Sequence, residues 1–209
     1  MSDLHVITFL SIDGVMQAPG MPDEDRSGGF ALGGWQVPFS DDDQNRIIDG
    51  LFANAGAFLL GRKTYEIFAA YWPSHTDPKD KVAGALNRLP KHVVSRTLTD
   101  PTWSNSSVVR GDVATEVARI KREAIPRGKQ LHVWGSGNLV RTLAQHGLVD
   151  EYLLWFYPVV LGDGKRLFQP GFTSGSFEVV GSERTSKGAT VNRYRRAGKV
   201  KQGTFARES

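Results

Sequence analysis

Apolar residues along the chain follow two patterns, short uninterrupted runs and longer segments with helical spacing. Uninterrupted runs predict buried strands, at residues 4–10, 57–60, 92–95, 107–110, 131–134 and 152–161. Segments in which apolar positions share one face predict helices, at residues 40–55, 65–71, 77–89, 112–124 and from the turn after 134 to about 147. Two final runs, at residues 177–184 and 190–196, flank a Ser-Lys-Gly turn and predict a β-hairpin.

Local signals predict where several of these helices begin. Ser40 and Asp43 form a capping pattern for the first helix. The Asp77-Pro78 pair predicts the start of a later helix, and Asp112 is placed to cap another. The inner face of the first helix is apolar, and its residues are Ile47, Ile48, Leu51, Phe52 and Ala55.

Strands that alternate with helices predict an α/β fold with a central, mostly parallel sheet, to which the hairpin adds antiparallel strands at one side. We expect one domain over residues 1–196 and a basic, flexible tail over residues 197–209. Residues 15–39 are rich in Gly and Pro and contain aromatic residues without periodicity. Such a long loop predicts an active-site lid.

Composition narrows the classes of function. The 209 residues include no cysteine, which excludes disulfides and thiolate metal sites, and the five histidines show no metal-ligand spacing, so no metal site is expected. No apolar run approaches the roughly 18 residues of a membrane span, and we expect a cytoplasmic protein. The net charge of +4 is spread along the chain except near its end, which does not favour nucleic acid as a partner.

Polar and glycine-rich motifs follow four of the predicted strands. They are Ser11-Ile12-Asp13-Gly14, Gly61-Arg62-Lys63-Thr64, Ser95-Arg96 and Gly135-Ser136-Gly137-Asn138. Ligands of such sheets bind beyond the carboxyl ends of the strands, so the motifs are expected to meet in one site. Their cations and hydroxyls, together with the N–H groups of two helix starts, suit a pyrophosphate and an additional ribose phosphate, which favours NADPH over NADH.

Other nucleotide and hydrolase motifs do not fit. The segment 56–64 has a strand where a P-loop needs its phosphate-binding turn. Gly135-Ser136-Gly137 lacks the spacing of a nucleophile elbow. Val140 stands where a Rossmann dinucleotide motif has its third glycine.

In their order and spacing, the motifs S-x-D-G, G-R-x-T-Y-E, V-S-R-T, W-G-S-G and D-E-Y-L-L-W-F-Y-P-V-V-L-G-D-G resemble the dihydrofolate reductase-like family. The resemblance is closest to the C-terminal reductase domain of bacterial riboflavin biosynthesis enzymes, and it covers residues 4 to 196. It implies a central mixed sheet of about eight strands flanked by helices, NADPH as cofactor, a small-molecule substrate and a homodimer.

The same resemblance implies roles for individual residues. The implied cofactor-binding residues are Gly61, Arg62, Lys63, Thr64, Ser95, Arg96, Gly135, Ser136, Gly137 and Asn138. Among them, Ser95 and Arg96 would meet the 2′-phosphate. Asp13 would face the nicotinamide and the substrate as the catalytic residue, with a turn residue that bonds backbone as the alternative. The expected substrate-binding residues are Ser11, Gly14, Trp35 and Phe39, and Trp72 is a further candidate for a wall of the substrate site.

The implied activity is hydride transfer from NADPH to a small heterocycle, as in 5-amino-6-(5-phosphoribosylamino)uracil reductase, where the ribosyl group becomes ribityl. One alternative is a dihydrofolate or pterin reductase, but folate-reducing members carry a carboxylate on the inner face of the first helix, which is apolar here. Another alternative is a catalytically silent NADPH-binding dimeric module. A nucleic-acid binder would rest on the basic charge alone.

Overall fold

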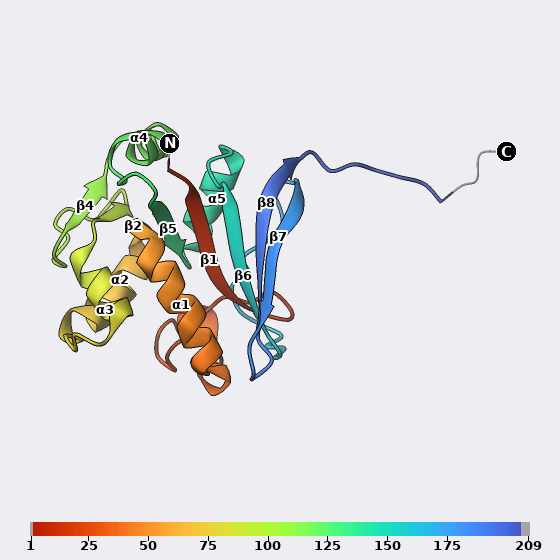
Figure 1. Cartoon of the computed structure of the whole chain (residues 1–209), viewed down its shortest axis with the longest axis horizontal. Coiled ribbons are helices and arrows are strands. Elements are labelled where there is room, and N and C mark those ends of the chain that lie inside the picture. Colours follow the sequence, from red (N-terminus) through yellow and green to blue (C-terminus); the bar gives the residue numbers. More distant parts are fainter. Residues whose placement is uncertain (1, 206–209) are drawn as a thin grey trace.

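The apolar runs of the sequence form an eight-stranded sheet in the computed structural model, which describes residues 2–205 (Figure 1). The strands are β1 (Leu4–Ser11), β2 (Ala55–Gly61), β3 (Lys91–Val94), β4 (Ser106–Val109), β5 (Gln130–Trp134), β6 (Glu151–Tyr157), β7 (Ser176–Arg184) and β8 (Thr190–Gly198). Their order across the sheet is β4-β3-β2-β5-β1-β6-β8-β7.

The six strands from β4 to β6 are parallel, whereas β8 runs antiparallel to β6 and β7 antiparallel to β8. At the centre, Ile7 pairs with Trp134 of β5 on one side and with Leu153 of β6 on the other. The predicted fold class, a mostly parallel sheet with a C-terminal hairpin, is therefore confirmed.

Five α-helices connect the parallel strands within the described residues. They are α1 (Asp42–Asn54), α2 (Arg62–Tyr71), α3 (Lys81–Arg88), α4 (Val113–Glu123) and α5 (Gly137–Gln145), and the loops add the short 3-10 helices η1 (Ser27–Gly29), η2 (Val37–Phe39) and η3 (Trp72–Ser74). Three of the α-helices have an aspartate N-cap. Asp41, Asp80 and Asp112 each accept a hydrogen bond from the backbone N–H three residues on.

These caps correct two predicted helix starts. Asp41, and not Ser40, caps α1. Asp80 caps α3, so that helix begins at Lys81 and not at Asp77. A third correction concerns Arg62, Lys63 and Thr64, which were expected in a turn but form the first turn of α2. At the other end of the chain, β6 stops at Tyr157, because Pro158 has no backbone N–H to continue the ladder.

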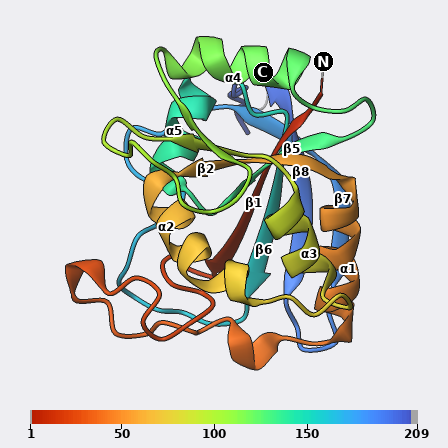
Figure 2. The same ribbon diagram turned by 90° about the vertical axis from the view of Figure 1, so that its left-hand side faces the viewer.

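Side chains alternate between the two faces of the sheet and build two apolar layers. Ile7, Phe58 and Trp155 point to the layer that packs under α1 and α3, while Val6 and Val133 point to the layer under α4 and α5. Figure 2 shows the loop after β1 below α2 and α3, at the end towards which β1 and β6 run. The carboxyl ends of the parallel strands therefore open onto the predicted lid.

The end of the chain differs slightly from the predicted domain boundary. β8 continues to Gly198, and residues 199–205 are exposed coil, so the tail begins after 198 instead of after 196. The part of the predicted tail at residues 206–209 lies outside the described residues. In residues 2–205, no helix combines the length and the apolar character that crossing a membrane requires.

Candidate active site

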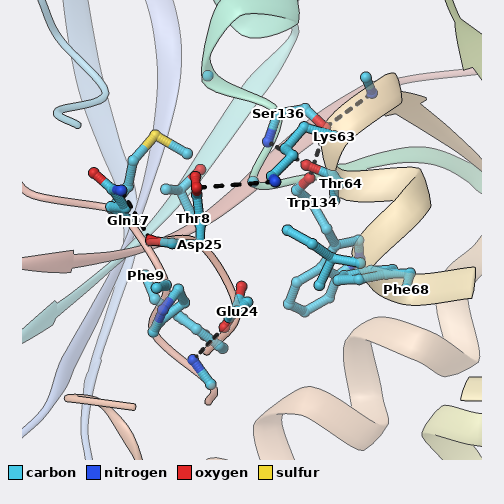
Figure 3. A pocket seen from close by; sticks show the side chains of 18 of the residues that line it. Thr8, Phe9, Gln17, Glu24, Asp25, Lys63, Thr64, Phe68, Trp134 and Ser136 are labelled. Carbon is cyan, nitrogen blue, oxygen red and sulfur yellow. Dashed lines mark hydrogen bonds and ion pairs between the residues drawn. The ribbon is translucent and has the colours of Figure 1, made fainter. Parts of the chain in front are cut away.

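The two glycine turns that the sequence singles out lie side by side, because β2 and β5 are neighbours in the sheet. The backbone N–H of Gly61 donates to Ser136 Oγ at 3.0 Å, and the N–H of Ser136 donates to Thr64 Oγ1 at 3.2 Å. Ser136 Oγ in turn donates to the carbonyl of Trp134 at 3.0 Å. These reciprocal bonds join the starts of α2 and α5 into one rim, part of which Figure 3 shows.

The turn before α5 is tight. Gly135 and Ser136 have φ values of 55° and 53°, in the left-handed region, which costs a non-glycine residue such as Ser136 about 1 kcal/mol. The bonds that Ser136 makes to both turns hold it there. Residues in this conformation often belong to ligand-binding sites.

The helices that start at this rim differ from the other three. Within the described residues, the N-cap residues of α2 and α5, Gly61 and Ser136, make no side-chain capping hydrogen bond to their own helix, whereas α1, α3 and α4 each have an aspartate cap. The first backbone N–H groups of an uncapped helix carry partial positive charge and accept an anion readily. Two such helix starts at one rim suit a diphosphate.

A cavity of about 830 Å³ lies below the rim. Both glycine turns line it, and its apolar wall consists of Phe9, Ile48, Phe52, Phe68, Trp72 and Trp134. The rings pack closely, with Phe52 stacked on Trp134 at 5.0 Å between centroids and Phe9 edge-on to Trp134 at 6.1 Å. This apolar wall, called the aromatic chamber below, suits a planar ring.

The predicted lid closes one side of the cavity through Asp25. Its buried carboxylate accepts a hydrogen bond from Lys165 Nζ at 2.6 Å and lies 4.0 Å from Lys63 Nζ. Burial favours the neutral form of Asp25, but hydrogen bonds from Lys165 and Ser27 outweigh it and lower the pKa of the carboxyl. Asp25 thus joins the lid both to the start of α2 and to the segment after β6.

Glu24, the neighbour of Asp25, also lines the cavity. Its carboxylate accepts from the backbone N–H groups of Gly20 at 2.7 Å and Met21 at 3.2 Å. Desolvation is the largest influence on this carboxyl and raises its pKa. Among the described carboxylates that line the cavity, Glu24 is therefore the one that holds a proton most readily.

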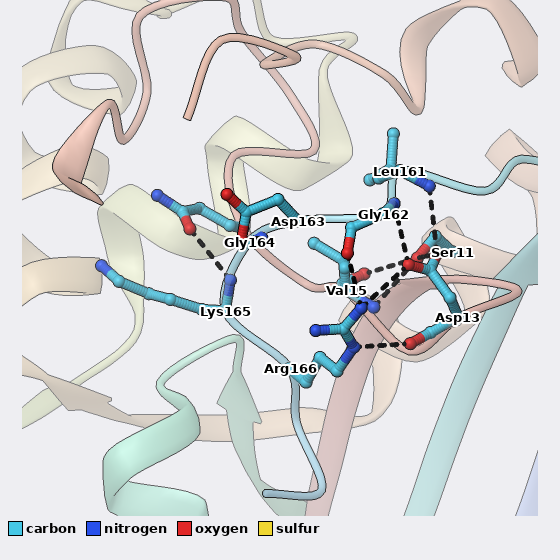
Figure 4. Close-up of polar contacts among 10 residues, drawn as sticks. Ser11, Asp13, Val15, Leu161, Gly162, Asp163, Gly164, Lys165 and Arg166 are labelled. Atoms are coloured by element: carbon cyan, nitrogen blue, oxygen red, sulfur yellow. Dashed lines mark hydrogen bonds and ion pairs between the residues drawn. The ribbon is translucent and has the colours of Figure 1, made fainter. Parts of the chain in front are cut away.

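Asp13, the predicted catalytic residue, is placed differently from the expectation. It does not line the cavity, and it fixes the turn after β1 to the segment after β6 (Figure 4). Its carboxylate accepts from Ser11 Oγ at 2.7 Å, from the backbone N–H groups of Leu161 and Gly162 at 3.1 and 3.0 Å, and from Arg166 at 3.1 Å.

The hydrogen bonds from Ser11 and Leu161 lower the pKa of Asp13 from 3.8 to about 2. At neutral pH only about one molecule in 10⁵ is then protonated, so Asp13 is a poor proton donor. The placement of Asp13 fits the alternative that the sequence left open, a turn residue that bonds backbone, better than it fits a catalytic residue.

The predicted substrate-binding residues also lie beside the cavity and not on its lining. Ser11 is buried against Asp13, and Gly14 takes a φ of 80° in the same turn. Trp35 and Phe39 pack on the ring of Tyr157, at 5.7 and 6.0 Å. Ser11 and Gly14 therefore shape the turn, whereas Trp35 and Phe39 pack behind the residues that line the cavity. Trp72, the further candidate, does line the cavity.

Ser95 and Arg96 follow β3, next to the start of α2. Ser95 Oγ accepts from the backbone N–H groups of Thr97 and Leu98 at 3.2 and 3.0 Å, while Arg96 is exposed. Arg62 bonds Thr97 and also pairs with Glu66 at 2.6 Å. The loop therefore lies at the outer edge of the rim, off the cavity lining, and its contact with a 2′-phosphate stays a prediction.

A group of amides also lines the cavity, and the sequence pattern singled out neither Gln36 nor Gln44 of it. Gln36, Gln44 and Asn45 line it. Gln44 Oε1 accepts from Gln36 Nε2 at 3.1 Å and from the hydroxyl of Tyr157 at 3.0 Å. A signal was present, because Gln44 precedes Ile48 and Phe52 by one and two helical turns and so shares their face.

No group of three or more His, Asp or Glu side chains within residues 2–205 is arranged to hold a metal ion. The cavity presents amides, aromatic rings, a few charged groups and the two helix starts to a ligand.

The chain matches the family model of the RibD C-terminal domain over residues 4–191. A curated relative, an uncharacterized protein YyaP of Bacillus subtilis, is 33% identical over 113 residues, which are 53% of this chain and 57% of that relative. The match thus spans little more than half of the relative's length.

Solved structures share the fold over nearly the whole chain. A putative riboflavin biosynthesis protein from Shewanella has a TM-score of 0.66 at 19% identity, with 93% of this chain and 98% of that one covered. A pyrimidine reductase-like protein from Corynebacterium diphtheriae has a TM-score of 0.63 at 13% identity, with 93% and 92% covered.

A third similar structure is a longer, two-activity protein. It is a diaminohydroxyphosphoribosylaminopyrimidine deaminase/5-amino-6-(5-phosphoribosylamino)uracil reductase from Thermotoga maritima, with a TM-score of 0.59 at 13% identity. The alignment covers 94% of this chain and 57% of that protein.

Proposed function

The chain belongs to the RibD C-terminal domain family, and we propose that it is an NADPH-dependent reductase that transfers hydride to a small heterocyclic substrate. The observation that carries the proposal is the rim, at which two uncapped helix starts, bonded to each other through Ser136, open onto one cavity. One activity printed for the Thermotoga relative, 5-amino-6-(5-phosphoribosylamino)uracil reductase, belongs to the same reaction class.

The residues present at the rim fit a dinucleotide phosphate. A side chain at Gly135 would come within 3.6 Å of Thr64 Oγ1 and would narrow the space between the two turns. The free N–H groups at the starts of α2 and α5 would hold the diphosphate, and Lys63 and Arg141 add positive charge on the same side. Arg96 at the outer edge would meet the 2′-phosphate.

Bound NADPH supplies the hydride. Hydride transfer asks the protein mainly to align donor and acceptor carbons in a dry pocket. Phe9 and Trp134 provide flat apolar surfaces for this, and the lid, held by Asp25, closes one side of the cavity. Glu24 lines the same cavity and, with its raised pKa, is better suited than Asp13 to hold a proton for the acceptor.

Titration with NADPH and with NADH, followed by tryptophan fluorescence, tests the cofactor assignment, since Trp72 and Trp134 line the cavity. Loss of NADPH absorbance with a panel of pyrimidine and pterin substrates then tests turnover. We expect NADPH to bind more tightly than NADH and at least one heterocycle to be reduced.

Absence of NADPH binding would contradict the whole assignment. Binding without turnover across the panel would favour the catalytically silent module instead. The proposal includes the homodimer that the family resemblance implies, and light scattering of the full chain measures it directly.

A further inference from the structure

The cations that line the cavity are unevenly distributed. In the described part of the chain, they are Arg62, Lys63, Arg141, Lys165 and Arg166. The first two lie in the first turn of α2, and Arg141 lies one helical turn after Gly137 on the same face of α5, so these three belong to the rim. Lys165 and Arg166 belong to the segment that follows β6.

Both cations of the segment after β6 are already neutralised. Lys165 donates to Asp25 at 2.6 Å, and Arg166 pairs with Asp13 at 3.1 Å. Asp25 is buried and also lies 4.0 Å from Lys63, so one carboxylate opposes two lysines of the cavity. Arg141 alone among the described lining cations has no acidic partner, and it lies on the side of the cofactor.

The aromatic chamber contains no cation among the described residues that line the cavity. The amides of Gln36, Gln44 and Asn45 line the same cavity, and Gln44 lies one helical turn before Ile48 of the chamber. An amide side chain offers both a donor and an acceptor, which match the lactam edge of a neutral heterocycle. A phosphate monoester, which carries about −1.5 to −2 charges at neutral pH, has no counter-charge there.

From this distribution of charge we infer that the chamber accepts an uncharged, planar nitrogen heterocycle and rejects substrates that carry a phosphate group. The inference rests on the proposed reductase function and concerns its substrate class. It separates this chain from the Thermotoga relative, whose printed substrate is a phosphoribosyl compound. Asp25 acts as a specificity residue, because it pairs with Lys165 and approaches Lys63, and so lowers the positive charge that could otherwise hold a phosphate.

The test uses two probes that differ only in a phosphate, 5-amino-6-ribitylaminouracil and its 5′-phosphate. Each is titrated into the 209-residue chain saturated with NADP⁺, so that no NADPH is present to reduce the probe, and binding is followed by tryptophan fluorescence. We expect the unphosphorylated probe to bind at least about thirtyfold more tightly, as expected for a buried anion without a partner. Saturation with NADP⁺ is established first, so failure of the proposed cofactor function appears as a separate result.

The variant Asp25→Asn releases Lys63 and Lys165 and should reduce the preference for the unphosphorylated probe by about tenfold or more. Asp23→Asn is the matched control, because Asp23 is an exposed acid of the same loop that pairs with Arg26 and does not line the cavity. It should leave the preference unchanged.

Three outcomes contradict the inference. One is equal or tighter binding of the phosphorylated probe by the wild-type protein, and another is a preference that Asp25→Asn does not change. Failure of both probes to bind the NADP⁺-saturated protein also contradicts it, because the unphosphorylated probe belongs to the class that the chamber should accept.

Discussion

Replacement of Asp13 distinguishes a structural turn residue from a catalytic one. In Asp13→Asn, the amide can still accept one backbone hydrogen bond, but its NH₂ group must face the N–H of Gly162 or the guanidinium of Arg166, both of which are donors. The variant therefore loses contacts that join the end of β1 to the segment after β6. We expect lower stability and a nearly unchanged affinity for NADPH.

The size of the effect follows from the pKa of Asp13. A pKa lowered from 3.8 to about 2 in the folded protein corresponds to about 2.4 kcal/mol of stabilisation at neutral pH. This is an upper value, because 22% of the side chain is exposed to solvent, which screens the interaction. We expect the free energy of unfolding to fall by about 1–2 kcal/mol and the melting temperature by about 3–6 °C.

Because the folded pKa of Asp13 is depressed, its contribution is fully present above the unfolded pKa near 4 and is lost as the pH falls towards 2. Urea denaturation at pH 7, 5 and 3.5 should therefore show a constant difference between wild type and variant at the two higher values and a smaller one at the lowest. Asp163→Asn is the matched control in the neighbouring turn, because within residues 2–205 Asp163 accepts only from the N–H of Gly164.

An Asp13→Asn variant that keeps wild-type stability but loses most of its turnover would refute this reasoning. Asp13 would then be the catalytic residue that the sequence suggested. A loss of stability as large in Asp163→Asn would also refute it, because that carboxylate joins no distant segments.

Three further predictions concern the cofactor, the proton and the pH dependence. Arg96→Ala should weaken NADPH binding by about tenfold or more and leave the affinity for NADH nearly unchanged, since the variant removes the partner of the 2′-phosphate. Equal losses of affinity in titrations with both cofactors would exclude that role. Glu24→Gln should lower kcat and remove the fall in kcat on the alkaline side of the pH profile, because the raised pKa of Glu24 makes it the group that donates the proton. An unchanged pH profile would indicate that water donates the proton instead. Burial lowers the pKa of His132 to about 3, so the neutral ring stabilises the fold above about pH 6.5, and the free energy of unfolding falls by up to about 1.4 kcal/mol per pH unit below it. The free energy of unfolding of His132→Gln should therefore depend less on pH between pH 6.5 and 4.5. The exposed control His146→Gln should show the pH dependence of the wild type.

The sequence predicted the elements well where one physical rule decides the outcome. A buried parallel strand needs an unbroken apolar run, so β1 and β2 were found within one or two residues of their ends. The first residue of a helix was harder to predict where two nearby aspartates could each serve as the N-cap. Asp77 and Asp80 both precede α3, and only the fold shows that Asp80 is the one that meets a free backbone N–H.

The glycine-rich side of the site was predictable for a similar reason, whereas the opposite side was not. Gly61 and Gly135 follow neighbouring parallel strands, so topology alone brings their turns together. The direction of a side chain at a strand end depends on partners far along the chain, and the Asp13 carboxylate turns away from the cavity because Leu161, Gly162 and Arg166 offer it three donors.

The charge that the cavity presents to a ligand also depends on partners that are distant in the sequence. Asp25 and Lys165 lie 140 residues apart, yet their ion pair, together with the approach of Lys63, lowers the positive charge that these two lysines present to a ligand. A count of basic residues in the motifs overstates the positive charge available to a substrate, because Lys63 lies near Asp25 of the lid and Arg62 pairs with Glu66 of α2. The motifs therefore indicate which cofactor binds, whereas the contacts of Asp25 with Lys165 and Lys63 determine which substrates bind beside it.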